Sequence, residues 1–278
     1  MKIIYSDNAV LSDISTNATN YHSGSDAFNF TAAEDYFYIG QRFAFNEFWM
    51  NIATLNTASS VMSLSYWDGK VWRAVVEVND GTSGFTQSGK VDFVPDRQYG
   101  WMMEDTVRTS SGTEEITGLG NVTIYDRYWL RIAFSVDLDA STAIGWVGRL
   151  FASDEDLYSE YPMFNNSSLK TAIEAGKTTY EEQRLRATEV TIDNLISNTT
   201  ITNGNQLLDA EKLKTIVVSK TAEIVFGMLG FDEYEDDRKR ARAEYSARLN
   251  KDIFNVDRNA NATLDDKETN VRQGRMWR

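Results

Sequence analysis

The sequence predicts an α+β protein with two domains: a jelly-roll-like antiparallel β-sandwich over residues 1–153 and an α-helical bundle over residues 154–255. Six of the seven tryptophans precede Pro162, in short aromatic and β-branched runs that turn residues separate. Charge divides at the same place. Residues 1–163 hold 22 acidic and 10 basic side chains, a balance of −12, and the remainder holds 19 and 18, a balance of −1, which together give −13. Each part is long enough to bury its own core.

Composition excludes several classes of protein. The absence of cysteine excludes disulfides, thiolate zinc sites and thiol catalysis. The single histidine, His22, excludes a multi-histidine metal site, and we expect it on the surface. A pI of about 4.6 argues against broad adhesion to DNA, which needs clustered basic residues. No apolar run fits a signal peptide or a bilayer-spanning helix, so we expect a soluble protein without a membrane partner.

The β-half contains one clear local signal. The Asp68-Gly69 pair lies between two apolar runs and predicts a two-residue type I′ hairpin, which would set Trp67 opposite Lys70. By alternation, Trp67 and Trp72 then share one face of the sheet. Further strands are expected at 36–39, 43–53, 89–94, 128–136 and 143–147.

Two features of this half invite a functional interpretation. Trp67 and Trp72 are either a platform for stacking a sugar or residues that pack in a core or interface. Glu114 and Glu115 lie in a long polar loop over 108–121 and superficially suggest glycoside hydrolysis. Adjacent carboxylates rarely face each other across a substrate, so a solvated loop is the better interpretation. We expect no catalytic residue and no enzyme activity.

Helical periodicity begins after Pro162. The pattern Thr178-Thr-Tyr-Glu181 predicts a capping box that opens a helix ending near Ser197. Asp209 is the expected cap of the next helix, which Gly230 should end. The predicted helices are therefore 168–175, 178–197, 209–229 and 232–254.

Residues 256–278 combine an EF-hand-like loop with a tail. Oxygen-bearing side chains occur at the spacing of the twelve-residue calcium loop, although Ala262 replaces the glycine of its sharp turn. The loop either binds Ca²⁺ or keeps its shape without metal, so no cofactor is required. The candidate ligands are Asp257, Asn259, Asn261, Thr263, Asp265 and Glu268.

The tail is basic and aromatic. Such a segment either docks into a groove on a partner or is a frayed terminus. The candidate docking residues are Arg272, Arg275, Trp277 and Arg278.

The β-half resembles a β-sandwich module of tailed-phage virion proteins. The resemblance covers residues 36–147. It is carried by Tyr38-Ile-Gly40, Tyr66-Trp-Asp-Gly-Lys-Val-Trp72, Asp80-Gly-Thr82 and Tyr128-Trp-Leu-Arg131.

The second half resembles the head-tail connector family of tailed bacteriophages, also called adaptor or head-completion proteins. The resemblance covers the helices from Asp154 onward, the acidic loop and the basic tail, and is clearest in 169–175, 187–196, 222–229 and 238–249. It implies a homo-oligomeric ring of about twelve subunits, a dodecamer, beneath the portal. It also implies a channel through which DNA passes without sequence-specific binding.

The resemblance implies two partners, the portal protein and a tail, tail-terminator or nozzle protein, and a place in the virion neck after assembly in the host cytoplasm. An acidic wall repels DNA and lets it slide, so the net charge fits a conduit better than a clamp. The alternative is a carbohydrate-binding or surface-adhesion β-sandwich with a calcium-stabilised helical appendage, in which Trp67 and Trp72 bind the ligand.

Overall fold

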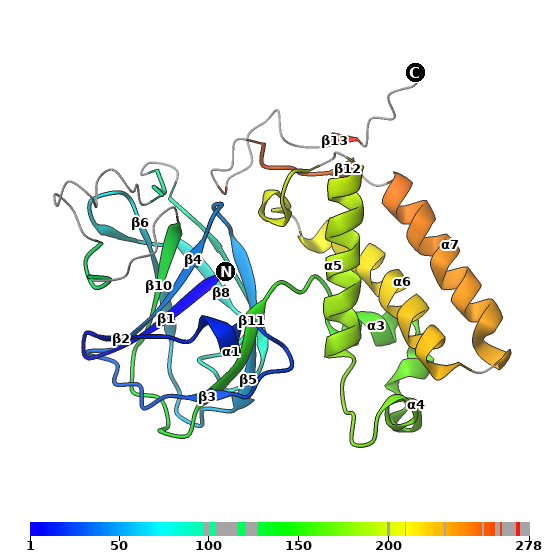
Figure 1. Ribbon diagram of the computed structural model, residues 1–278, viewed down its shortest axis with the longest axis horizontal. Helices are drawn as coiled ribbons and strands as arrows, with labels where there is room; N and C mark the ends of the chain where they lie inside the picture. The colour runs from blue at the N-terminus through cyan, green and yellow to red at the C-terminus, as the bar shows by residue number, and fades with distance from the viewer. Residues whose placement is uncertain are drawn as a thin grey trace. The chain divides into compact units, whose positions relative to one another are not determined.

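The computed structural model describes residues 1–96, 100–103, 116–120, 127–198, 201–208, 210–230, 232–251, 253–258, 262 and 271–272. Two compact units divide the chain (Figure 1). One comprises Met1–Gly148 with Asn259–Thr263, and the other Arg149–Arg258 with Leu264–Arg278. The boundary between the two units falls between Gly148 and Arg149, close to the expected division after residue 153. Strands dominate the first unit and helices the second, so the predicted α+β class is confirmed.

Two antiparallel sheets build the first unit. The larger consists of β1 (Lys2–Asp7), β2 (Val10–Asp13), β4 (Tyr36–Gln41), β6 (Met62–Trp67), β7 (Trp72–Ala74) and β10 (Tyr128–Phe134), in the order β2-β1-β4-β10-β6-β7. The smaller consists of β3 (Asp26–Ala27), β5 (Glu47–Thr54), β8 (Glu77–Asp80), β9 (Gly89–Val94) and β11 (Ala143–Gly148), in the order β3-β11-β5-β9-β8. A one-turn helix, α1 (Ser15–Ala18), follows β2.

One apolar core receives side chains from both sheets. Ile39 and Leu130 from the larger sheet and Met50 and Val91 from the smaller belong to the same buried cluster. Aromatic residues supply much of its volume; for example, the Phe30 and Phe37 rings stack with centroids 5.4 Å apart. Because alternate residues of each strand enter this core, the intervening residues of β5 and β11 project from the opposite face of the smaller sheet.

The first hairpin has no counterpart in the sequence-based expectations. Asp7 pairs with Val10 across a two-residue turn, Asn8-Ala9, whose φ angles are 44° and 67°. Positive φ at both positions is the type I′ geometry that Asn-Gly usually signals. Alanine replaces that glycine at a cost of about 1 kcal/mol, so the usual sequence signal is missing.

The expected type I′ turn at Asp68-Gly69 is wrong. Trp67 pairs with Trp72, and the connection contains four residues. Gly69 has a φ of 92°, but Asp68 is not in the positive-φ region that a type I′ turn requires there. The reason is local: the Asp68 carboxylate accepts hydrogen bonds from the amides of Lys70 and Val71, both at 2.8 Å. This Asx-type capping favours the longer loop, although both tryptophans still share one face, as predicted.

Helices dominate the second unit (Figure 1). Their shared core includes Tyr180, Ala187, Leu213, Val217 and Tyr245. The α-helices are α3 (Asp154–Glu160), α4 (Ser167–Ile173), α5 (Glu181–Ser197), α6 (Ala210–Leu229) and α7 (Glu235–Lys251). Shorter elements are the 3₁₀ turns η1 (Pro162–Asn165), η2 (Gly204–Gln206) and η3 (Asp232–Tyr234) and the strand pair β12 (Ile253–Phe254) and β13 (Val271–Arg272).

These helices lie close to the predicted ranges, with differences at their ends. No capping box forms at Thr178, because α5 starts later, at Glu181. Its N-cap residue is Tyr180, whose side chain makes no capping hydrogen bond. Asp209 lies outside the described residues, while Gly230, with a φ of 65°, follows α6 as expected. The last helix ends at Lys251 rather than Phe254, because residues 253–254 pair with 271–272 as strands.

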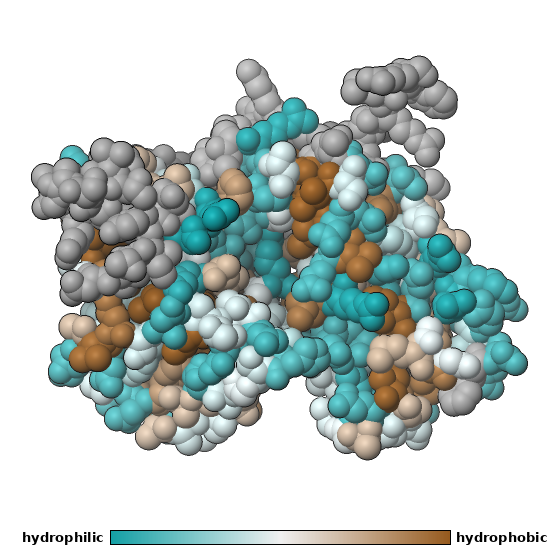
Figure 2. All heavy atoms as spheres, in the orientation of Figure 1, coloured by the Kyte–Doolittle hydropathy of each residue, from teal (hydrophilic) through white to brown (hydrophobic). Residues whose placement is uncertain are grey.

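Helix α7 is strongly charged along its outer side. Arg238 pairs with Glu235 at 2.9 Å, and Arg240 pairs with Glu244 at 3.4 Å. Hydrophilic residues cover much of this edge of the helical unit (Figure 2). Within the described ranges, no helix is both long enough and apolar enough to span a bilayer.

Candidate functional site

The structure describes three residues of the EF-hand-like loop, namely Asp257, Arg258 and Ala262. Asp257 is buried, and its amide donates to the Gln206 carbonyl at 2.8 Å. Ala262 has a φ of 60°, the conformation expected for the sharp turn of such a loop. Among the described residues, no group of three or more histidine or acidic side chains is arranged to hold a metal ion. Calcium binding stays a prediction, because five candidate ligands lie outside the described residues: Asn259, Asn261, Thr263, Asp265 and Glu268.

The candidate docking tail is described only at its first residue. The backbone of Arg272 pairs with Ile253 in the two-stranded β12-β13 ladder. Arg275, Trp277 and Arg278 lie outside the described residues, as do the loop carboxylates Glu114 and Glu115.

Trp67 and Trp72 lie on the outer face of the larger sheet, where Trp67 is buried and Trp72 is half-buried. Trp67 is only 4% exposed and belongs to a second apolar cluster that Ile116 and Leu119 help to form. The Trp72 indole N–H donates to the Thr117 carbonyl at 2.7 Å. These contacts engage both rings in packing inside the first unit.

Arg131 adds a cation to the same aromatic cluster. Its guanidinium lies 5.0 Å from the centroid of the Trp72 ring and 4.8 Å from that of the Tyr36 ring. A cation in this position is attracted to the aromatic faces. Arg131 covers this face of the Trp72 ring. A sugar could stack there only if it displaced the guanidinium.

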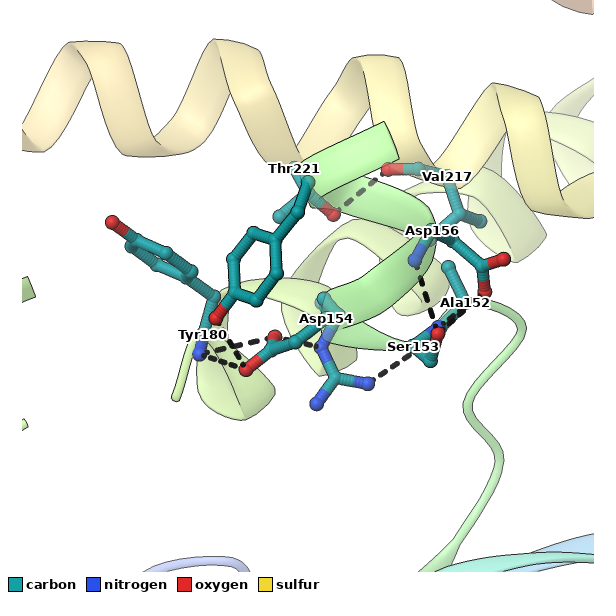
Figure 3. Close-up of polar contacts among 9 residues, drawn as sticks. Ala152, Ser153, Asp154, Asp156, Tyr180, Val217 and Thr221 are labelled. Carbon is teal, nitrogen blue, oxygen red and sulfur yellow. Dashed lines mark hydrogen bonds and ion pairs between the residues drawn. The ribbon is translucent and has the colours of Figure 1, made fainter. Parts of the chain in front are cut away.

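A buried polar cluster in the helical unit was not expected from the sequence (Figure 3). The Asp154 carboxylate at the start of α3 pairs with Arg184 of α5, with Oδ1 and Nε 2.8 Å apart. The two side chains are only 11% and 4% exposed, respectively. The same carboxylate accepts the Tyr180 amide, at 3.2 Å, and the Tyr158 hydroxyl, also at 3.2 Å. Asp154 thereby accepts the backbone N–H of Tyr180, the N-cap residue of α5.

Two aromatic rings border this carboxylate, and a second cation lies over those rings. The Lys170 ammonium lies 4.7 Å from the centroid of the Tyr158 ring and 5.8 Å from that of the Tyr180 ring. Burial, and then the charge of Asp154, raises the pKa of Tyr180 to about 12. Burial, followed by the charge of Asp154 and the hydrogen bond to it, also raises the pKa of Tyr158. The raised pKa values keep both phenols protonated even in alkaline solution, so Tyr158 still donates to Asp154 there.

The start of α3 carries a reciprocal cap. The Asp156 amide donates to Ser153 Oγ at 3.1 Å, and the Ser153 amide donates to Asp156 Oδ2 at 2.7 Å. Burial alone would raise the pKa of Asp156, but the hydrogen bonds from Ser153 and the charge of Lys214 outweigh it and lower that pKa. The Ser-x-x-Asp pattern at 153–156 was the sequence signal that could have located this helix start.

Two arginines join other parts of the helical unit. Arg149 donates to the Leu207 carbonyl at 2.8 Å and also to the Gly204 carbonyl. Arg248 of α7 donates to Glu160 of α3 at 2.8 Å and to the Thr215 carbonyl of α6 at 2.7 Å. Together with the Asp154 cluster, these bonds hold the helices in one arrangement.

Comparison with known proteins leaves the family open. No protein-family model matches the chain, and no curated protein matches it. The functional argument therefore depends on the residues and their geometry.

Proposed function

We propose that the chain is a structural virion protein, a head-to-tail connector or adaptor that forms a ring beneath the portal of a tailed bacteriophage. In this role it extends the DNA channel, joins the capsid to the tail in the virion neck and performs no catalysis. Its partners are the portal protein, a tail, tail-terminator or nozzle protein, and about eleven further copies of itself.

The run of helices after Asp154 carries this proposal. Helices α3 to α7 occupy the segment on which the connector resemblance rests, and the ranges 187–196, 222–229 and 238–249 all lie within helices. The Asp154, Arg149 and Arg248 contacts join elements of this segment that are far apart in the sequence, as a ring subunit that bears load between capsid and tail would need.

Charge supports the same role. The whole chain carries −13, which disfavours adhesion to DNA and suits a channel through which DNA must slide. Helix α7 exposes charges of both signs along its outer side, where neighbouring subunits of a ring could pair them. We also propose that the β-sandwich has a jelly-roll-like topology and that the helices form a bundle.

The test is assembly on the portal. The purified full chain is mixed with purified portal protein and examined by negative-stain electron microscopy and by light scattering after gel filtration. We expect a ring seated on the portal. A chain that stays monomeric and adds no density to the portal would contradict the proposal.

Tail variants sharpen this experiment. Replacing Arg275, Trp277 and Arg278 together by alanine should abolish portal binding while the far-UV circular dichroism spectrum stays unchanged. The matched control replaces Arg42, Lys70 and Arg186 by alanine, which removes the same number of side chains from exposed positions outside α7 and the tail and should leave portal docking intact. If both variants lost portal binding to the same extent, the loss would reflect the removal of positive charge in general and not docking by the tail.

The carbohydrate-binding alternative, as placed on Trp67 and Trp72, gains no support from the observed packing. Trp67 is buried, and both the N–H and one face of Trp72 contact protein groups.

A further inference from the structure

The outer face of the smaller sheet carries a pocket remote from the two tryptophans considered above. Strands β5 and β11 form its floor, and the loop that precedes β3 forms its wall. Its volume is about 360 Å³, near the lower end of the range for small-ligand sites. Every residue that lines it belongs to the first unit: Tyr21, Ser23, Ser25, Asn51, Ala53, Gly145 and Trp146.

The strand register brings the two central residues together. Asn51 and Trp146 are direct cross-strand partners, and both face away from the core that Met50 and Val147 enter. The register shifts between Ile144 and Trp146, so Gly145 is an extra residue in β11. Such bulges redirect side chains and are frequent beside binding sites.

The absence of a side chain at Gly145 leaves room for the Asn51 side chain at the floor of the pocket. A Cβ atom at this position would overlap the side-chain oxygen of Asn51. A larger residue would therefore displace the Asn51 carboxamide from the place it occupies above the sheet.

The wall is held in place by local hydrogen bonds. The Ser23 amide donates to the Asn20 carbonyl at 3.0 Å, and Asn17 donates to Asp26 at 3.1 Å. The Tyr21 ring meets the Trp146 ring edge-on, with centroids 5.8 Å apart. These contacts organise the pocket before any ligand arrives.

The lining chemistry selects the class of ligand. It combines aromatic rings, one carboxamide and two serine hydroxyls, and it includes no Asp, Glu, Lys or Arg side chain. A phosphate or carboxylate ligand would find no cation there, and a wholly apolar ligand would leave the two serine hydroxyls unsatisfied. A neutral polyhydroxylated ring, with apolar C–H faces and hydroxyls at its edge, matches both kinds of group.

We propose that this pocket binds a neutral saccharide of monosaccharide or disaccharide size, through hydrogen bonds to Asn51 and the serine hydroxyls and packing against Tyr21. The inference goes beyond the connector role. It rests on the first unit alone, so its failure leaves ring formation untouched, and failure to form a ring leaves this pocket untouched.

The test is ligand binding by the full chain. Glucose, galactose, mannose, N-acetylglucosamine and their common disaccharides are titrated by calorimetry and by saturation-transfer NMR, with glucuronate and glucose 6-phosphate as charged counterparts. We expect at least one neutral saccharide to bind with a Kd of about 1 mM or tighter, and the charged counterparts to bind at least about tenfold more weakly.

Variants locate the binding. Asn51→Ala should weaken it about tenfold, and Ala53→Gln, which fills the pocket from an exposed position, should abolish it. Tyr21→Phe should bind like the wild type and Tyr21→Ala should not, because the ring face supplies the contact. The matched control is Asn79→Ala on exposed β8 of the same sheet, which should bind normally.

Three results would overturn the inference. They are no binding of any neutral saccharide, preferred binding of a charged one, and undiminished binding by Ala53→Gln. Because Ala53 is exposed, that variant decides the question even if Asn51→Ala fails to fold.

Discussion

Asp154→Asn should destabilise the helical unit severely. The substitution preserves the size of the side chain and removes the negative charge that faces Arg184 at 2.8 Å. Arg184 is 4% exposed, so water cannot replace the lost partner. Breaking a buried ion pair from one side costs about 3 to 5 kcal/mol of unfolding free energy.

We expect a value near 3 kcal/mol, the lower end of that range. Arg184 keeps its hydrogen bond to the Ala152 carbonyl at 2.6 Å, and the new carboxamide oxygen still accepts one of the donors that Asp154 served. The double variant Asp154→Asn with Arg184→Met removes both charges, so its loss should be smaller than the sum of the two single losses.

Urea unfolding followed by two signals measures the effect. Far-UV circular dichroism reports on the helices, while tryptophan fluorescence reports mainly on the first unit, which holds six of the seven tryptophans. We expect the helical transition to move to lower urea and the fluorescence transition to move less. Asp193→Asn, on the exposed side of α5, is the matched control and should change neither.

A loss below about 1 kcal/mol for Asp154→Asn would refute the reasoning, since that is the cost of an ordinary substitution. Full additivity in the double variant would also count against it, because it would mean that Asp154 and Arg184 do not stabilise each other.

Three further substitutions have defined outcomes. Tyr180→Phe should leave the thermal midpoint unchanged, because its buried hydroxyl has no hydrogen-bond partner among the described residues, whereas Tyr158→Phe should cost about 1 to 3 kcal/mol through loss of its bond to Asp154. Because the folded-state pKa of Asp156 lies below its ordinary value of 3.8, its contribution is present above that pH and is lost as pH falls through the folded-state pKa. Urea midpoints should therefore fall in acid less steeply for Asp156→Asn than for the wild type. Ala9→Gly should stabilise the first unit by up to about 1 kcal/mol in thermal melts, because φ at this turn position is 67°; a loss of stability there would contradict the assigned turn.

Much of the chain followed from local patterns. β9 spans the predicted 89–94 range, and α5 and α6 end where periodicity and Gly230 indicated. β1 was missed because both its faces are buried, with Ile3 in the main core and Ile4 in the outer cluster, so it shows no polar alternation. The hairpin register was wrong because a single carboxylate, Asp68, caps the loop amides and overrides the dipeptide preference.

The sequence by itself determined the division into a β-rich and a helical part, because periodicity and composition act over a few neighbouring residues. Only the tertiary structure decided which distant side chains meet. Asp154 reaches Arg184, and Asn51 stands beside Trp146, through helix packing and strand register. Such pairings depend on where whole elements dock, which spacing along the chain does not encode. Both the buried ion pair and the proposed saccharide pocket are of this kind.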